Sequence, residues 1–147
     1  MKIYLATDHA GYELKEAVKK HLREKDFEVE DVGALIYDKE DDYPDFIFPL
    51  ARKIARDKDA RGIIFGGSGQ GEAMAANRVR GVRAAVYYGG EEQIITLSRE
   101  HNDANILSIG ARFVKENKIM KLIEFWLSTA FSRAARHQRR INKLDEA

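Results

Sequence analysis

The stretch of this sequence best suited to chemistry is a glycine-rich loop followed at once by an acid. Residues 62–78 read GIIFGGSGQGEAMAANR, so a short apolar run leads into GGSGQG and then into Glu72. Glycines between a strand and a helix let several backbone N–H groups point inward together, and such donors stabilise negative charge. A glutamate beside them suits a general base for a carbon acid. It takes the proton while the N–H groups and Ser68 stabilise the oxyanion that forms.

The loop does not match the two common nucleotide-binding motifs. Residues 66–71 have the glycine frame of a nucleoside-triphosphate loop, but Glu72 and Ala73 stand where Lys and Ser or Thr are required. The dinucleotide fingerprint also fails, because its third glycine would fall at position 72. Glu72 has an alternative, non-catalytic role as an acid in the first turn of a helix, where the helix dipole favours its ionised form. Residue types and spacing alone slightly favour this structural role.

Five short β-rich runs alternate with helical patterns along the chain. The β-rich runs are residues 2–7, 27–32, 62–66, 83–88 and 105–110, and the helical patterns are residues 12–25, 46–57, 71–79, 91–101, 115–129 and 131–144. This alternation predicts a doubly wound, Rossmann-like α/β fold: a five-stranded parallel sheet with helices on both faces, plus a C-terminal helix. The length fits one domain, so residues 1–147 are predicted to form a single domain.

In such folds ligands bind beyond the carboxyl ends of the strands. Asp8 and His9 follow the first predicted strand, the glycine loop follows the third, and Arg112 follows the fifth. We expect these residues to converge on one rim. His101 is a weaker candidate for that rim because it precedes the fifth strand, so its side chain could face away.

Two further segments are candidates for a functional role. Residues 33–45 form the only long irregular stretch, which suggests a functional or mobile loop, and we expect its DDYPD run to be exposed and acidic. Near the end of the chain, Arg136 and Arg140 are four residues apart and share a helix face, which suits a phosphate group. Two alternatives stay open for that basic helix: cations that complement the helix dipole, or a nucleic-acid patch.

Composition excludes several classes of function. The chain has 25 basic and 24 acidic residues, a net charge of +1 and no cysteine, so it has no disulfide, thiolate metal site or cysteine nucleophile. The balanced charge argues neither for nor against nucleic acid. No apolar run approaches the ~18 residues of a membrane span, and the start, MKIYLATDHAG, does not resemble a signal peptide. We therefore expect a cytoplasmic protein without membrane contact.

Five motifs together resemble the type B ribose-5-phosphate isomerase family, which also contains galactose-6-phosphate and allose-6-phosphate isomerases. The motifs are TDHAG, DYPDF, GGSGQGEAMAANR, SREHNDANILSIGAR and RHQRR, in register from Met1 to about Leu144. The resemblance implies interconversion of ribose 5-phosphate and ribulose 5-phosphate, a step of the pentose phosphate pathway, through a cis-enediolate. It implies no metal and no cofactor. It also implies a homodimer or a dimer of dimers, with each active site shared between subunits.

The resemblance assigns roles to individual residues. In one branch of the family a Cys after the third strand removes the C2 proton, and the matching position here is Gly66. In another branch a Glu after the loop is the base, and Glu72 matches it, so the resemblance favours the catalytic role of this residue. The other implied roles are ring opening by His101, enediolate stabilisation by Ser68 with Gly67, Gly69 and Gly71, alignment of hydroxyls by Asp8 and Asn102, phosphate binding by His9, Arg112, Arg136 and Arg140, and unspecified contacts by Tyr43 and His137.

Other functions remain as alternatives. The same loop and base would serve a hexose 6-phosphate, because sequence does not show the distance between the reacting carbon and the arginines. A non-catalytic sugar-phosphate or nucleotide sensor would share the fold and the basic helix. A metal site is not expected, since His9 and His101 have no third ligand at a suitable spacing. Nucleic acid is not an expected partner, because the basic segment is short and lacks aromatic residues.

Overall fold

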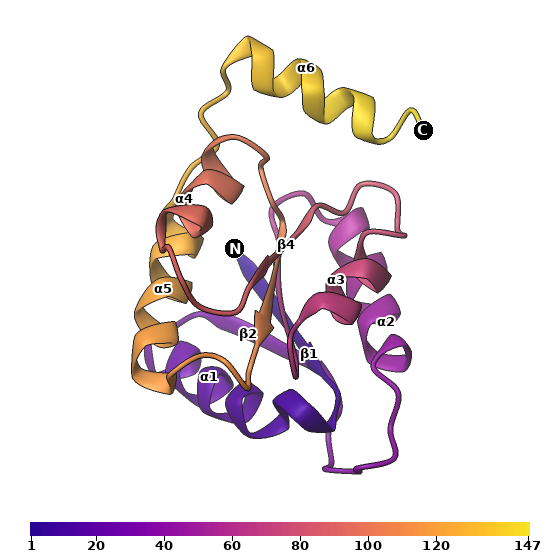
Figure 1. The fold of residues 1–147 in the computed structure, drawn as a ribbon, viewed down its shortest axis with the longest axis vertical. Coiled ribbons are helices and arrows are strands. Elements are labelled where there is room, and N and C mark those ends of the chain that lie inside the picture. Colours follow the sequence, from indigo (N-terminus) through magenta and orange to yellow (C-terminus); the bar gives the residue numbers. More distant parts are fainter.

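The computed structural model describes all 147 residues as alternating strands and helices (Figure 1). The strands are β1 (Lys2–Thr7), β2 (Glu28–Gly33), β3 (Arg61–Gly66), β4 (Ala84–Tyr87) and β5 (Ile106–Gly110). The helices are the short 3₁₀ helix η1 (His9–Gly11), α1 (Tyr12–Glu24), α2 (Pro44–Arg56), α3 (Gln70–Ala76), α4 (Gln93–Glu100), α5 (Glu116–Ser128) and α6 (Ala135–Leu144). The alternation predicted from the sequence is confirmed, with ends shifted by a few residues.

The five strands form one sheet in the order β2-β1-β3-β5-β4, and all four pairings are parallel. From β1 the chain moves outward to β2 and then returns to place β3 on the other side of β1. This reversal leaves a crevice beyond the carboxyl ends of β1 and β3, the usual ligand position in a doubly wound sheet. Asp8 and the glycine loop begin at these two strand ends. The predicted Rossmann-like fold is confirmed.

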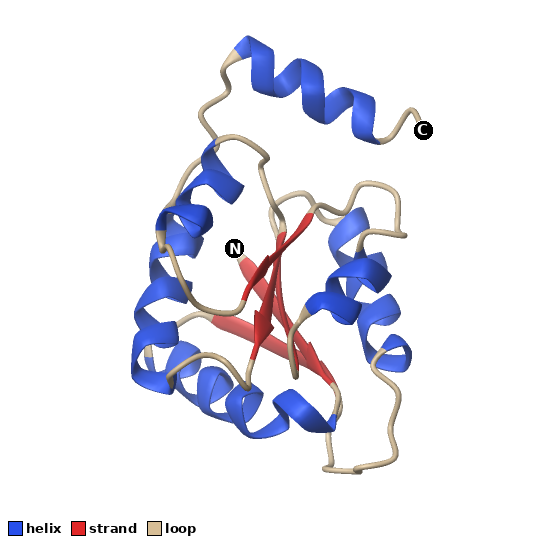
Figure 2. Ribbon diagram, in the orientation of Figure 1, coloured by secondary structure: helices blue, strands red, loops and turns tan.

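Helices cover both faces of the sheet (Figures 1 and 2). Each face has its own hydrophobic core. On one face, residues of α1, α4 and α5 pack against the strands, with Val18, Leu22 and Trp126 fully buried. On the other face α2 and α3 contribute, with Ile47 and Leu50 fully buried. Both layers hold the strands rigidly, which fixes the loops at the strand ends. No helix is long and apolar enough to cross a membrane.

The C-terminal helix differs most from its predicted extent. It begins at Ala135 instead of residue 131, and it lies apart from both helical layers, at the end of the molecule near the end of α4 (Figure 1). Arg133 has a φ of 57°, a left-handed conformation that an α-helix does not accommodate. Residues 131–134 are therefore a connector, and α6 carries Arg136 and Arg140 away from the sheet.

An ion pair buried beside the sheet anchors the start of the long irregular loop. Lys15 of α1 has no exposed surface, and its Nζ donates to both carboxylate oxygens of Asp31 on β2, each at 2.8 Å, and to the Ala34 carbonyl at 2.5 Å. The Ala34 N–H donates in turn to the Thr7 carbonyl at 2.9 Å. A buried lysine requires such partners because its charge is otherwise costly. The network thereby ties the loop to the end of β1, next to Asp8.

Candidate active site

The residues expected on the carboxyl rim do lie together there. Asp8 follows β1, the glycine loop follows β3, and Arg112 follows β5. The Ala111 N–H donates to the Gly66 carbonyl at 2.8 Å, and the Arg112 N–H donates to the Gly67 carbonyl at 3.1 Å. These two bonds extend the β3–β5 pairing past the strands and bring Arg112 against the loop. The sequence-based prediction of convergence therefore matches the geometry.

Glu72 lies directly against the backbone of Gly66. Its side chain is nearly buried, at 4% exposed, although it belongs to the first turn of a helix. A Cβ atom built on Gly66 would overlap the carboxylate carbon and both carboxylate oxygens of Glu72. The space that any side chain at position 66 would need is thus filled by the carboxylate. A base at 72 and a side chain at 66 exclude each other, which gives a physical reason for glycine at this position.

The electrostatics of Glu72 differ from the expectation for a helix-capping acid. Burial raises its pKa above the ordinary value, and the negative charge of Asp8 raises it further. A hydrogen bond from its own backbone N–H lowers the pKa but does not offset burial. The stabilisation of the ionised form by the helix dipole, expected from sequence, is therefore outweighed by desolvation. A raised pKa brings a carboxylate closer to the working range of a general base.

The glycines of the loop let neighbouring groups pack closely against its backbone. Gly69 has a φ of 78°, and a Cβ there would lie 2.9 Å from the backbone carbon of Ile109, so only glycine fits without strain. A Cβ on Gly71 would lie 2.7 Å from the Tyr43 ring, and a Cβ on Gly67 would lie 3.0 Å from a guanidinium nitrogen of Arg112. Tyr43 and Arg112 therefore lie on the loop itself, together with the half-buried Ser68.

His9 is hydrogen-bonded to Asp41, a contact that the sequence did not predict. Asp41 accepts a hydrogen bond from the His9 backbone N–H at 3.0 Å and another from Nδ1 of its ring at 2.7 Å. This bond is the main cause that raises the pKa of His9, and it favours the protonated, cationic ring. The side chain of Asp41 is only 8% exposed, so the expectation of an exposed acidic loop is wrong at this position. Asp41 belongs to the DDYPD run that the sequence analysis describes. No spacing rule, however, predicts its contact with His9.

Asp8 completes this group. It is buried, its carboxylate accepts the Ala10 N–H at 2.9 Å, and burial raises its pKa despite that bond. Ligand atoms of Asp8, His9 and Asp41 all lie within 4.8 Å of one another, so the three could hold a metal ion. In the structure His9 and Asp41 instead bond to each other. The expectation that the protein works without metal or cofactor stays a prediction.

The other predicted site residues lie at the opposite end of the sheet. His101 is the C-cap of α4, and its ring stacks on the buried His137 ring of α6 with centroids 4.2 Å apart. Burial lowers the pKa of His137, and the charges of His101, Arg136 and Arg140 lower it further. Asn102 is exposed, and only its backbone carbonyl is engaged, accepting from Arg83 at 3.1 Å. Strand β3 spans six residues, roughly 16–20 Å at about 3.3 Å per residue, and separates this group from Glu72.

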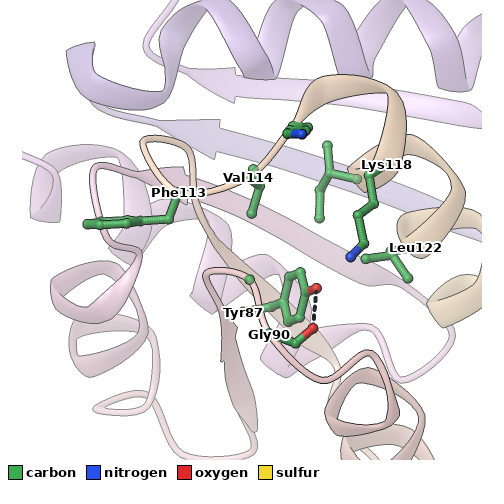
Figure 3. A pocket seen from close by; sticks show the side chains of 9 residues that line it. Tyr87, Gly90, Phe113, Val114, Lys118 and Leu122 are labelled. Atoms are coloured by element: carbon green, nitrogen blue, oxygen red, sulfur yellow. Dashed lines mark hydrogen bonds between the residues drawn. The ribbon is translucent and has the colours of Figure 1, made fainter.

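A separate cavity of about 240 Å³ opens beside β4 and the start of α5 (Figure 3). Its walls include Tyr87, Phe113, Val114 and Leu122, with Lys118 at one side. The Tyr87 hydroxyl donates to the Gly90 carbonyl at 3.3 Å, so it is already engaged. None of the predicted site residues lines this cavity, and it contains no carboxylate. It lacks the groups that proton transfer on a sugar would require.

Comparison with known proteins places the chain among sugar isomerases. The profile of the Ribose/Galactose Isomerase family matches residues 3–144. The chain belongs to this family. Ribose-5-phosphate isomerase B of Mycobacterium tuberculosis (strain CDC 1551 / Oshkosh) is 43% identical over 146 residues, which cover 99% of this chain and 89% of that protein. A putative sugar phosphate isomerase of Bacillus subtilis (strain 168) is 36% identical and is covered to 96%.

Solved structures agree with this membership. Ribose-5-phosphate isomerase B from Mycoplasma genitalium with bound ribulose-5-phosphate superposes with a TM-score of 0.92 at 40% identity, covering 99% of this chain and 94% of that one. The Clostridium thermocellum enzyme of the same name gives a TM-score of 0.92 at 39% identity, covering 99% and 96%. The chain is therefore an enzyme of the sugar-phosphate isomerase type, as the five motifs predicted.

Proposed function

We propose that this protein interconverts ribose 5-phosphate and ribulose 5-phosphate through a cis-enediolate, with Glu72 as the base. The observation that carries the mechanism is the position of Glu72, buried against Gly66 beside the glycine loop. The substrate is inferred from relatives that bear the name ribose-5-phosphate isomerase B and from the relative solved with ribulose-5-phosphate. Its expected cytoplasmic location and its place in the pentose phosphate pathway stay predictions from the sequence.

The carboxyl rim supplies the proton transfer. Glu72 would take the proton from C2 of the open-chain sugar and return it to C1, while loop N–H groups and Ser68 stabilise the negative oxygen of the enediolate. Asp8 would accept hydrogen bonds from sugar hydroxyls. Burial raises the pKa of Glu72, and the negative charge of Asp8 raises it further, because two negative charges in one crevice are unfavourable. A proton on Glu72 during turnover relieves that repulsion.

The phosphate would be held by cations around the same crevice. Arg112 lies over Gly67, and the hydrogen bond to Asp41 raises the pKa of His9, which favours its cationic form. His101, Asn102, Arg136, His137 and Arg140 lie about the length of a strand away, too far to act with Glu72 of the same chain. We therefore propose that a second copy brings its α6 and its His101 to this rim. The active unit is then a homodimer, or a dimer of dimers, with each site built from two chains.

Replacement of the base tests the reaction. Glu72→Gln keeps the shape of the side chain but cannot accept the proton, so kcat should fall about 10²–10⁴-fold. Glu13→Gln, at an exposed position in the first turn of α1, is the matched control and should leave kcat unchanged. NMR in heavy water adds a direct readout, since the wild type should exchange the C2 hydrogen of ribose 5-phosphate with solvent. Near-normal turnover and exchange in Glu72→Gln would refute the assignment.

The same enzyme preparation decides the substrate. Values of kcat/KM for ribose 5-phosphate, allose 6-phosphate and galactose 6-phosphate, measured side by side, should be highest for the pentose. A higher value for either hexose would transfer the mechanism to that sugar without changing the role of Glu72. If none of the three sugar phosphates exchanged its C2 hydrogen with solvent, the result would favour a non-catalytic sugar-phosphate sensor.

Mixing two inactive variants tests the shared site. If each site takes Glu72 from one chain and Arg136 from the other, a mixed dimer of Glu72→Gln and Arg136→Ala contains one site with both changes and one with neither. Random reassociation then restores roughly a quarter of the wild-type sites. If each chain built its own site, mixing would restore no activity.

A further inference from the structure

A polar cavity at the amino ends of the strands takes no part in the proposed isomerisation. It has a volume of about 720 Å³, within the usual range for small-molecule sites. Its walls come from the start of β3, the end of α4 with the loop that follows, and the connector from α5 to α6. Four cationic side chains and two carboxylates line it: Lys58, Arg61, Arg99, Arg133, Asp59 and Asp103. The cavity therefore carries an excess of positive charge.

The pairing within the cavity leaves that excess uncompensated. Asp103 is already shared, since its two oxygens accept from Arg99 at 2.8 Å and from Arg83 at 3.1 Å. Arg99 is buried, and its remaining bonds go to the carbonyls of Thr129 and Ala104. One carboxylate thus serves two guanidinium groups.

Arg61 is the group most in need of a partner. Its Nη1 donates to the carbonyls of Ala60 at 2.8 Å and Lys58 at 3.3 Å, its Nε is buried with no partner, and its Nη2 makes no hydrogen bond within the protein. No carboxylate forms an ion pair with it. Burial lowers its pKa, the neighbouring charge of Arg99 lowers it further, and the charges of Asp103 and Asp59 offset this only in part. A desolvated cation beside another cation is stabilised by an anion bound between them.

We propose that this cavity binds a small phosphate-type oxyanion, held by Arg61 and Arg133 with the charge of Arg99 behind them. Arginine suits this role, because its planar group offers paired donors to phosphate oxygens. Arg133 is exposed, forms no ion pair, and stands on the connector that leads into α6. An anion that bridges Arg61 and Arg133 joins this connector to the sheet. It thereby steadies the helix that carries Arg136 and Arg140.

Equilibrium dialysis with radiolabelled inorganic phosphate, at constant ionic strength and without sugar, tests the proposal. The wild type should bind one more phosphate per chain than Arg61→Gln, which removes the charge but keeps an unbranched side chain. Arg52→Gln is the matched control, because Arg52 is exposed on α2 and does not line the cavity. Equal binding by wild type, Arg52→Gln and Arg61→Gln would overturn the proposal. The difference between variants does not depend on whether the protein isomerises ribose 5-phosphate.

A second variant keeps the test decisive if Arg61→Gln fails to fold. Arg133→Gln changes an exposed connector residue, so the fold should persist, and phosphate affinity at this site should fall about tenfold or more through loss of a charge-assisted bond. Isomerase kcat of both variants, measured at saturating sugar, should match the wild type. Unchanged phosphate affinity in a folded Arg133→Gln protein would exclude the proposed site.

Discussion

The contact between Gly66 and Glu72 makes a quantitative prediction about both stability and activity. A methyl group added by Gly66→Ala would overlap the buried Glu72 carboxylate. Overpacking of this kind costs about 1–3 kcal/mol. The backbone of Gly66 is not in the left-handed region, so alanine is otherwise tolerated and gains about 0.4–1 kcal/mol from a less flexible unfolded chain. Gly66→Ala should therefore leave the wild type up to about 2.5 kcal/mol less stable.

The same substitution should behave differently once the carboxylate is gone. In a Glu72→Ala background the overlap disappears, so Gly66→Ala should stabilise by about 0.4–1 kcal/mol. The difference between the two backgrounds is then the overpacking term, about 1–3 kcal/mol, measured by urea unfolding. The displaced carboxylate should also lower kcat of Gly66→Ala, by up to the 10²–10⁴-fold expected for loss of the base. Equal effects of Gly66→Ala on stability in both backgrounds, within about 0.5 kcal/mol, would refute the reasoning.

Three further predictions follow from the same crevice. Because the pKa of Glu72 is raised, the folded state binds its proton more tightly than the unfolded state, so stability falls as pH rises through the folded pKa. Urea unfolding should show this fall in the wild type and lose it in Glu72→Gln, and an identical pH dependence would contradict it. Asp41→Asn should lower the pKa of the His9 ring, seen by NMR titration, and raise KM more than it lowers kcat; an unchanged His9 pKa would exclude the contact. Gly71→Ala should push Tyr43 from the loop and cost about 1–3 kcal/mol, while Gly71→Ala with Tyr43→Phe should not relieve it, since the ring carbons also collide.

Local sequence patterns were sufficient for the elements of the fold. The four-residue spacing of Leu14, Val18 and Leu22 predicts α1, and two of these three side chains are fully buried against the sheet. Strand ends were predicted within one residue, since β-rich runs and glycines mark them. The start of α6 was missed because arginine is a good helix former, so the residue type at position 133 does not indicate the left-handed backbone that interrupts the helix. The burial of Lys15 was also missed, since its partner Asp31 lies on another element.

Some features of the candidate site could likewise be predicted from the sequence, and others could not. The loop, the proposed base and the proposed phosphate ligands could be named because each of them lies in a short motif that is contiguous in the chain. The link between His9 and Asp41 could not be named, because the two residues are 32 positions apart and meet only when the irregular loop folds back over β1. Contacts of this kind depend on the path of a loop, which residue types do not encode locally.

The sequence by itself determined which residues have suitable chemistry, which elements carry them, and to which family the chain belongs. Only the tertiary structure decided which of these residues lie together. It brings Asp8, His9, Asp41 and Glu72 into one crevice, and it leaves the His101–His137 stack at the far end of the sheet. The physical reason is the parallel sheet, in which strand ends gather at one edge while the returning helices end at the other. It also decided the direction of the Glu72 pKa shift, because burial raises this pKa where helix position alone would lower it.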